Sequence, residues 1–234
     1  MAPVGNVKIP GSNSPADINA ARQAMFPVTR HDFWNNSWFS DPLFFKQYPE
    51  DGVKLYGNDM PAIGPDDFEI IGQPLDFYPV NIYMGDEVRA GADGSPETVV
   101  LPAGHAITAN QWHIAPESLY WGPRFLYERY GKPICISENG IANMDWVHRD
   151  GKVHDPQRID FMGRYLLALR RAAADGVDVR GYFHWPIMDN FEWTEGYRQR
   201  FGLIFVDYET QKRTLKDSAL WYREIIATNG ENLD

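Results

Sequence analysis

The chain has 234 residues, of which 44% are hydrophobic and 23% charged, so it is expected to be globular, with one or two domains. A net charge of -10 argues against nucleic acid as a partner, because the phosphates would be repelled. No apolar run approaches the about 18 residues of a membrane span, and the first residues lack the apolar core of a signal peptide. We therefore expect a cytoplasmic protein with no nucleic-acid or membrane partner.

The first third of the chain predicts one short strand, one helix and a long irregular stretch. A strand-like segment at 7–9 precedes a helix that begins at Ser14, a good N-cap residue followed by Pro, and ends near Met25. Aromatic and polar residues alternate over 33–49. Several Pro and Gly residues predict that 50–74 is irregular.

The remaining two thirds alternate between apolar strands and amphipathic helices. Strands are expected at 76–84, 134–137 and 179–185, helices at 116–130, 156–174 and 216–227, and loops at 85–109 and 141–155; residues 203–208 are expected to form a hairpin strand, and the strand at 7–9 with its helix makes the first of the β/α repeats. Such β/α alternation requires a parallel sheet. The chain holds about four repeats, whereas a closed barrel of this kind needs eight.

The single cysteine, Cys135, lies in the apolar run of one predicted strand and forms no intrachain disulfide. We expect a small buried residue there rather than a catalytic thiol. The two histidines of the loop at 141–155 match no metal-site spacing and are interpreted as solvated.

Two stretches bring carboxylates and aromatic side chains close together in the sequence, which does not help a chain to fold. One is Ile136-Ser137-Glu138-Asn139-Gly140, in which a buried strand ends on a carboxylate followed by a turn. The other runs from Tyr182 through Trp185 to Trp193 and continues into Arg200-Phe201-Gly202. Buried carboxylates are costly unless paired, but indole faces and carboxylates together suit the C–H faces and hydroxyls of a sugar. The alternative is a structural loop with buried aromatic residues.

Both stretches resemble glycoside hydrolase family 1, the retaining β-glucosidases and β-galactosidases. That family has Glu-Asn-Gly at a strand end and a sugar-binding loop reading Trp-Ser-Leu-Leu-Asp-Asn-Phe-Glu-Trp, followed by Arg-Phe-Gly. The sequence departs from this loop only at Pro186, Ile187 and Met188. The resemblance extends over nearly the whole chain and matches the second half of the family's (β/α)8 TIM barrel. It implies an α/β fold in which residues 1–234 form a single domain containing strands five to eight.

The resemblance also implies roles for individual residues and no metal or organic cofactor. Glu138 would be the nucleophile that attacks a β-glycoside substrate, and Tyr83 would orient it. The implied sugar-binding residues are Asn81 beside the nucleophile, Trp185 as a platform, Glu192 and Trp193 for the hydroxyls, and Phe201 as a wall.

The second catalytic carboxyl has no counterpart in the sequence. Retaining glycosidases need two carboxyl groups about 5–5.5 Å apart, one of which acts as acid and base. In family 1 that group follows Asn in an Asn-Glu-Pro segment, and the sequence contains no such segment. Three hypotheses remain open: a second chain carrying the first half-barrel completes the enzyme, two copies form a carbohydrate-binding or scaffold dimer with little hydrolysis, or the chain is an inactive truncated relic.

Overall fold

The computed structural model describes residues 2–233, so both end residues of the predicted single domain lie outside the described part. A parallel sheet lies at the centre, with β5 (Ile134–Asn139) between β2 (Tyr78–Asn81) and β6 (Val179–His184). A single bridge extends the sheet beyond β2, where Val4 pairs with Asn81. The predicted α/β fold with parallel strands is confirmed.

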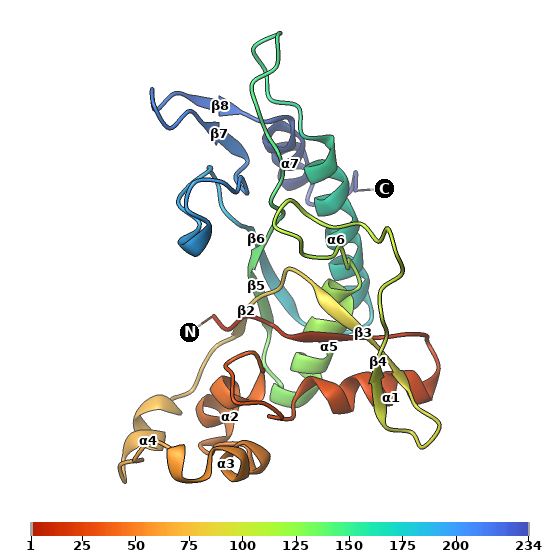
Figure 1. Ribbon diagram of the computed structural model, residues 1–234, viewed down its shortest axis with the longest axis vertical. Helices are drawn as coiled ribbons and strands as arrows, with labels where there is room; N and C mark the ends of the chain where they lie inside the picture. Colours follow the sequence, from red (N-terminus) through yellow and green to blue (C-terminus); the bar gives the residue numbers. More distant parts are fainter. Residues whose placement is uncertain (1, 234) are drawn as a thin grey trace.

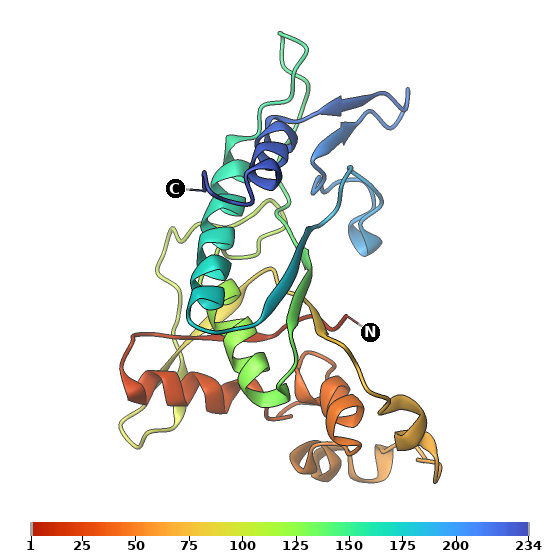
Figure 2. The same ribbon diagram turned by 180° about the vertical axis from the view of Figure 1, so that it is seen from behind.

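The helices α5 (Ser118–Tyr130), α6 (Pro156–Ala174) and α7 (Asp217–Ala227) lie on one side of this sheet (Figures 1 and 2). Their apolar faces and the inward side chains of β2 and β5 form the main core, in which Ile134 and Tyr165 are fully buried. The helices begin and end as the sequence predicts to within two residues.

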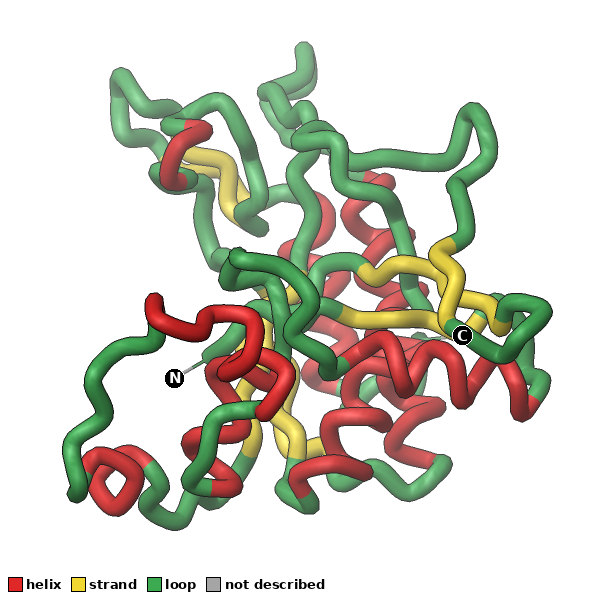
Figure 3. The backbone as a smooth tube through the Cα atoms, turned by 60° about the horizontal axis from the view of Figure 1, so that its bottom comes forward, coloured by secondary structure: helices red, strands yellow, loops and turns green. Residues whose placement is uncertain are grey.

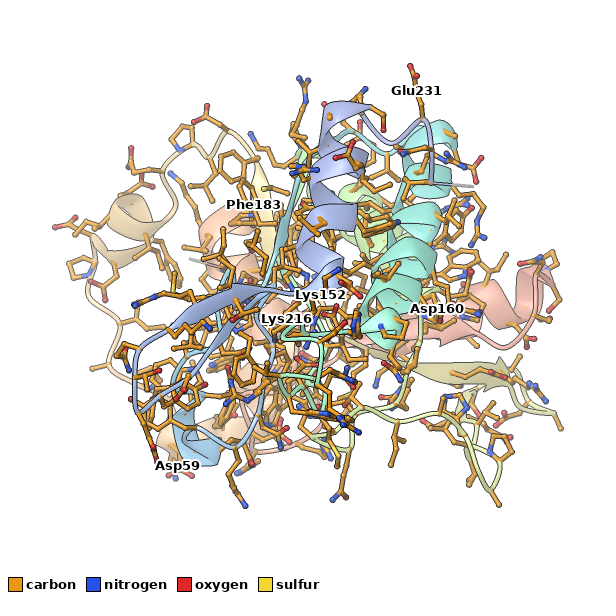
Figure 4. All side chains as sticks on the ribbon, turned by 90° about the horizontal axis from the view of Figure 1, so that it is seen from above. Asp59, Lys152, Asp160, Phe183, Lys216 and Glu231 are labelled. Atoms are coloured by element: carbon orange, nitrogen blue, oxygen red, sulfur yellow. The ribbon has the colours of Figure 1, made fainter. Side chains whose placement is uncertain are left out.

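The opposite face of the sheet is not covered by any helix of residues 2–233. A Cβ on Gly181 would lie 3.2 Å from the sulfur of Cys135 and 3.3 Å from the ring of Phe183, so these residues share this face. Cys135 is half-buried and Phe183 is 61% exposed. Phe183 is labelled in Figure 4. The chain therefore presents an apolar sheet face that it does not itself bury.

A second sheet corrects two predictions. It joins β1 (Val7–Pro10), β3 (Gly85–Ala90) and β4 (Pro96–Thr98), and α1 (Pro15–Met25) packs against it. The strand predicted at 7–9 is confirmed as β1, but it pairs with β3 rather than in the central sheet, and residues 85–98 of the predicted long loop contain two strands. The sequence pattern of this region did not reveal partners so distant along the chain.

Residues 50–74 are also more ordered than predicted. They contain α3 (Glu50–Tyr56), a 3₁₀ turn (Gly57–Asp59) and α4 (Asp67–Ile71), and α2 (Ser37–Phe45) precedes them. The ring of Trp38 lies 4.6 Å from the rings of both Tyr48 and Tyr56, which ties these short helices together. Tertiary packing of aromatic residues therefore overrides the local Pro and Gly signals.

Loops at the carboxyl ends of the central strands rise together above the sheet (Figure 3). The loop after β6 contains a 3₁₀ turn (Trp193–Glu195) and leads into a hairpin of β7 (Ile204–Val206) and β8 (Arg213–Leu215). None of the described helices is long and apolar enough to cross a membrane.

Candidate active site

Glu138 lies at the carboxyl end of β5, directly opposite Asn81 of β2 in the strand register. The hydroxyl of Tyr83 donates a hydrogen bond of 2.6 Å to its Oε2 atom. Burial raises the pKa of Tyr83 well above its ordinary value, and the hydrogen bond to Glu138 raises that pKa further. The phenol therefore stays protonated and acts as a permanent donor that fixes one carboxylate oxygen.

Amide side chains fix the strand end on both sides of the carboxylate. Asn139 is fully buried; its Nδ2 donates to the carbonyl of Ile82 at 2.8 Å, and its Oδ1 accepts from the hydroxyl of Tyr182 at 2.8 Å. Asn81 accepts from the hydroxyl of Ser137 at 2.8 Å. A turn was predicted at Asn139, but Asn139 is the last residue of β5. Its carbonyl accepts a hydrogen bond from the backbone N–H of Trp185.

Two aromatic rings lie beside Tyr83, the partner of Glu138. Phe201 is buried, and its ring centroid lies 6.3 Å from that of Tyr83. Trp112 lies 5.1 Å from Tyr83 and 6.1 Å from Phe201. No sequence motif marks Trp112, because one tryptophan in a polar loop carries no signal of its own. The structure brings it into the same cluster.

The loop after β6 contributes a second carboxylate and an indole. Nε1 of Trp185 lies 3.5 Å from Oε2 of Glu192, which is the outer limit of a hydrogen bond. Burial raises the pKa of Glu192, and the negative charges of Glu138 and Glu195 add to this effect. Glu138 and Glu192 are therefore close enough to interact electrostatically. Trp193, by contrast, is 78% exposed.

A buried ionic network holds this loop in place, and of its members only Asp189 and Arg200 belong to the motifs recognised in the sequence. Nζ of Lys216 donates to Asp189 at 2.7 Å and to Asp145 at 2.6 Å, and all three side chains are fully buried. Arg200 pairs with Asp189 at 2.6 Å, and Arg158 pairs with Asp145 at 2.8 Å. Figure 4 shows Lys216 among densely packed side chains at the start of α7. The network ties the loops after β5 and β6 to α6 and α7.

His184, the last residue of β6, lies close to this network. Its Nε2–H donates to the carbonyl of Phe201 at 3.2 Å, and its Nδ1 is buried without a hydrogen-bond partner among residues 2–233. Burial lowers the pKa of His184 to about 3, and the positive charges of Arg158 and Lys216 contribute. The ring is therefore neutral at physiological pH.

The depressed pKa of His184 predicts a loss of stability in mild acid. An unfolded histidine has a pKa of about 6.5. Between that value and the folded pKa of about 3, the unfolded chain binds the extra proton, so the free energy of unfolding falls as the pH falls. The slope from this group reaches about 1.4 kcal/mol per pH unit. Urea unfolding from pH 7 to pH 4.5 measures it.

In that experiment His184→Phe is expected to flatten the slope, whereas His31→Phe serves as the control, because His31 is exposed. Equal slopes for the two variants would show that His184 is protonated as easily in the folded chain as in the unfolded one.

No group of His, Cys, Asp and Glu within the described part of the chain is arranged to hold a metal ion. The structure thus brings together Glu138, Tyr83, Phe201 and Trp112, and places Glu192 with Trp185 within electrostatic range. Asn81 is the residue opposite Glu138 in the strand pairing of β2 and β5. Trp193 is exposed at the surface.

Residues 2–231 match the protein family described as "Glycosyl hydrolase family 1". The chain belongs to glycosyl hydrolase family 1. It is 39% identical over 222 residues to a 1,4-beta-D-glucan glucohydrolase of Thermotoga neapolitana, a match that covers 94% of the chain and 49% of the relative. It is 38% identical over 230 residues to beta-glucosidase A of Acetivibrio thermocellus, with 94% and 49% covered.

Solved family 1 structures agree with the sequence comparisons. A beta-glucosidase from Thermotoga maritima in complex with glucoimidazole superposes with a TM-score of 0.79 at 36% identity, covering 98% of this chain and 50% of that one. The chain thus spans about half the length of the family 1 relatives it matches. The predicted resemblance to the family is confirmed.

Proposed function

We propose that this chain forms the second half of the barrel of a retaining β-glycosidase, as a single domain containing strands five to eight, with Glu138 as the nucleophile. The hydrogen bond from Tyr83 to Glu138 at the carboxyl end of a parallel strand carries this proposal. Barrel enzymes keep their catalytic groups at that end. A carboxylate whose one oxygen is held by a neutral phenol keeps its other oxygen available for attack on an anomeric carbon.

The surrounding residues suit the glycone of a terminal β-glycoside. Trp185 offers an indole face to a pyranose ring, and the partly buried Glu192 offers acceptors to its hydroxyls. Phe201 and Asn81 form the buried sides of the site, and the exposed Trp193 is free to close on a bound sugar. The homologues' names support this substrate class, since they are β-glucosidases and a β-glucan glucohydrolase.

The acid/base carboxyl is proposed to come from the first half of the barrel, on a second chain. Glu192 is the carboxylate that interacts with Glu138, and its contact with Trp185 fits sugar binding. The uncovered sheet face with Phe183 supports such assembly, because exposed apolar surface and strand edges favour association. A second copy of this chain could cover the same face, but the dimer would contain two nucleophiles and no proton donor.

Covalent trapping tests the nucleophile without the missing acid. A 2-deoxy-2-fluoro-β-glucoside with a dinitrophenolate leaving group needs no protonation, so Glu138 should displace the phenolate and keep the fluorosugar as an ester. Peptide mass spectrometry is expected to find the sugar on Glu138. Tyr83→Phe should slow labelling about 10- to 100-fold, because a hydrogen bond to a charged group is lost.

Glu138→Gln is the control, and this variant should not be labelled. Label on another residue, or equal labelling of the Gln variant, would exclude Glu138 as the nucleophile.

A further inference from the structure

A second hollow of about 580 Å³ lies outside the candidate active site. Its wall includes residues 107–109, which belong to the hairpin that carries Trp112. Asn143 and Met144, just after β5, and Gln157, at the start of α6, line it as well. The volume falls in the range of about 300–1,000 Å³ that small-molecule sites have. Its lining comes from two loops of this chain and the start of α6.

Its most prominent wall is a fixed tryptophan. Trp146 is 58% exposed, and its ring is stacked on His148, with 4.8 Å between the centroids and 18° between the planes. The ring of His148 meets His154 edge-on at 5.0 Å. His154 is in turn held at both ring nitrogens, by Asp217 at 2.5 Å and Asp150 at 2.9 Å. An indole face is therefore kept exposed and oriented by a ladder of rings anchored on two carboxylates.

The remaining lining selects a neutral, hydroxylated ligand. Among the described residues no Asp, Glu, Lys or Arg lines the hollow, and both ring nitrogens of His154 are already paired with carboxylates. The exposed amide of Gln157 offers a donor and an acceptor, and Asn143, whose Nδ2 already donates to Asp145, adds its amide oxygen. The hydroxyl of Thr108, by contrast, is occupied by Asn110 and by the backbone N–H of Trp112. A flat aromatic face beside uncharged hydrogen-bonding groups matches a pyranose, whose C–H face is apolar and whose edge is polar.

We propose that this hollow is a second carbohydrate-binding site, with Trp146 as its platform, that holds an unhydrolysed part of a β-glucan away from the nucleophile. The pyranose class follows from the lining, whereas the choice of a β-1,4-linked glucose oligomer as probe rests on the proposed function. Because stacking on His148 already fixes the Trp146 side chain, it loses little conformational entropy when a sugar ring stacks on it.

Titration with cellotetraose tests the proposal, read from the indole N–H signals in ¹H–¹⁵N NMR spectra of the whole chain. The Trp146 signal, identified by its loss in Trp146→Phe, is expected to shift saturably. His148→Ala should weaken binding several-fold in this titration, and Trp146→Ala, which lacks the signal, should weaken binding by at least about tenfold when binding is measured by calorimetry. Trp34→Ala is the matched control, since Trp34 is 49% exposed and also packs on a neighbouring ring, that of Phe33.

The outcomes separate this site from the candidate active site. Shifts at Trp185 or Trp193 alone would overturn the second site and leave the proposed function standing. A shift at Trp146 without labelling of Glu138 would support the second site while the proposed function fails. No response at Trp146 at millimolar sugar, or an equal loss in Trp34→Ala, would overturn the second site.

Discussion

Mixing this chain with a polypeptide that contains the first four β/α units of a family 1 β-glucosidase is expected to produce hydrolysis of an aryl β-glucoside with retained configuration. Glu138→Gln should lower kcat of that mixture by about 10⁴-fold or more, because removal of a nucleophile removes the covalent path altogether. The chain alone should act, slowly, only on substrates whose leaving group needs no proton. The release of nitrophenol measures the rate of hydrolysis. NMR identifies the anomer that forms first and so reports whether the configuration is retained.

Glu117→Gln is the control for this experiment. Glu117 is also a carboxylate, but it is a surface residue that pairs with Arg171. The variant should keep the activity of the mixture. Activity that survives Glu138→Gln, or a mixture that stays inactive although native mass spectrometry shows a one-to-one complex, would contradict the proposed division of the barrel.

Lys216→Met is expected to destabilise the folded chain by about 3–5 kcal/mol, since removing one partner from a buried ionic network leaves charge uncompensated. Methionine has a similar volume, so the loss reflects charge and not packing. The variant leaves Asp145 and Asp189 with one cation each, Arg158 and Arg200. For a chain of this size the melting temperature should fall by about 10 °C or more, as measured by circular dichroism.

The matched control is Lys46→Met, because Lys46 pairs with Glu69 at the surface. An exposed pair contributes at most about 1 kcal/mol. A similarly small loss for Lys216→Met would show that water or a neighbouring cation replaces the ammonium group in the interior.

Acid should weaken the same network. Burial tends to raise the pKa of Asp145, but Arg158 and Lys216 act more strongly together and hold it below its ordinary value. A carboxyl with a depressed pKa stabilises the folded state above the unfolded pKa of about 3.9, and this contribution is lost as the pH falls through the folded pKa. Lowering the pH therefore lowers the free energy of unfolding in two overlapping ranges, through His184 between about 6.5 and 3 and through Asp145 below about 4.

The sequence predicted the parts of this molecule whose signals are local. Apolar runs of four to six residues before Glu138 and Trp185 predicted the central strands, and caps such as Ser14 predicted helix starts. The motifs placed Glu138 and Tyr83 near one another, and the structure brings their side chains into contact. The family assignment came from two motifs in order, a signal that single residues do not carry.

Other features depend on partners that local patterns do not name. Lys216 looks like any lysine before a helix, and its burial follows from two aspartates 71 and 27 residues away. Trp112 joins the site only because its hairpin folds back toward Phe201. The strand β3 escaped notice because its pairing partner β1 lies near the start of the chain. Each of these depends on tertiary contact, which the local periodicity of residues does not encode.

The buried network couples two loops and α7, so that these segments open together. Asp145 follows β5, the strand that carries Glu138, Asp189 belongs to the loop of Trp185 and Glu192, and Lys216 caps the last helix. Because one ammonium group serves both carboxylates, neither loop can leave its position without breaking contacts of the other. We therefore expect the loop after β5 and the loop after β6 to unfold and refold as one cooperative segment together with α7. A bound sugar that orders one loop would, by the same coupling, protect all three from exchange with solvent.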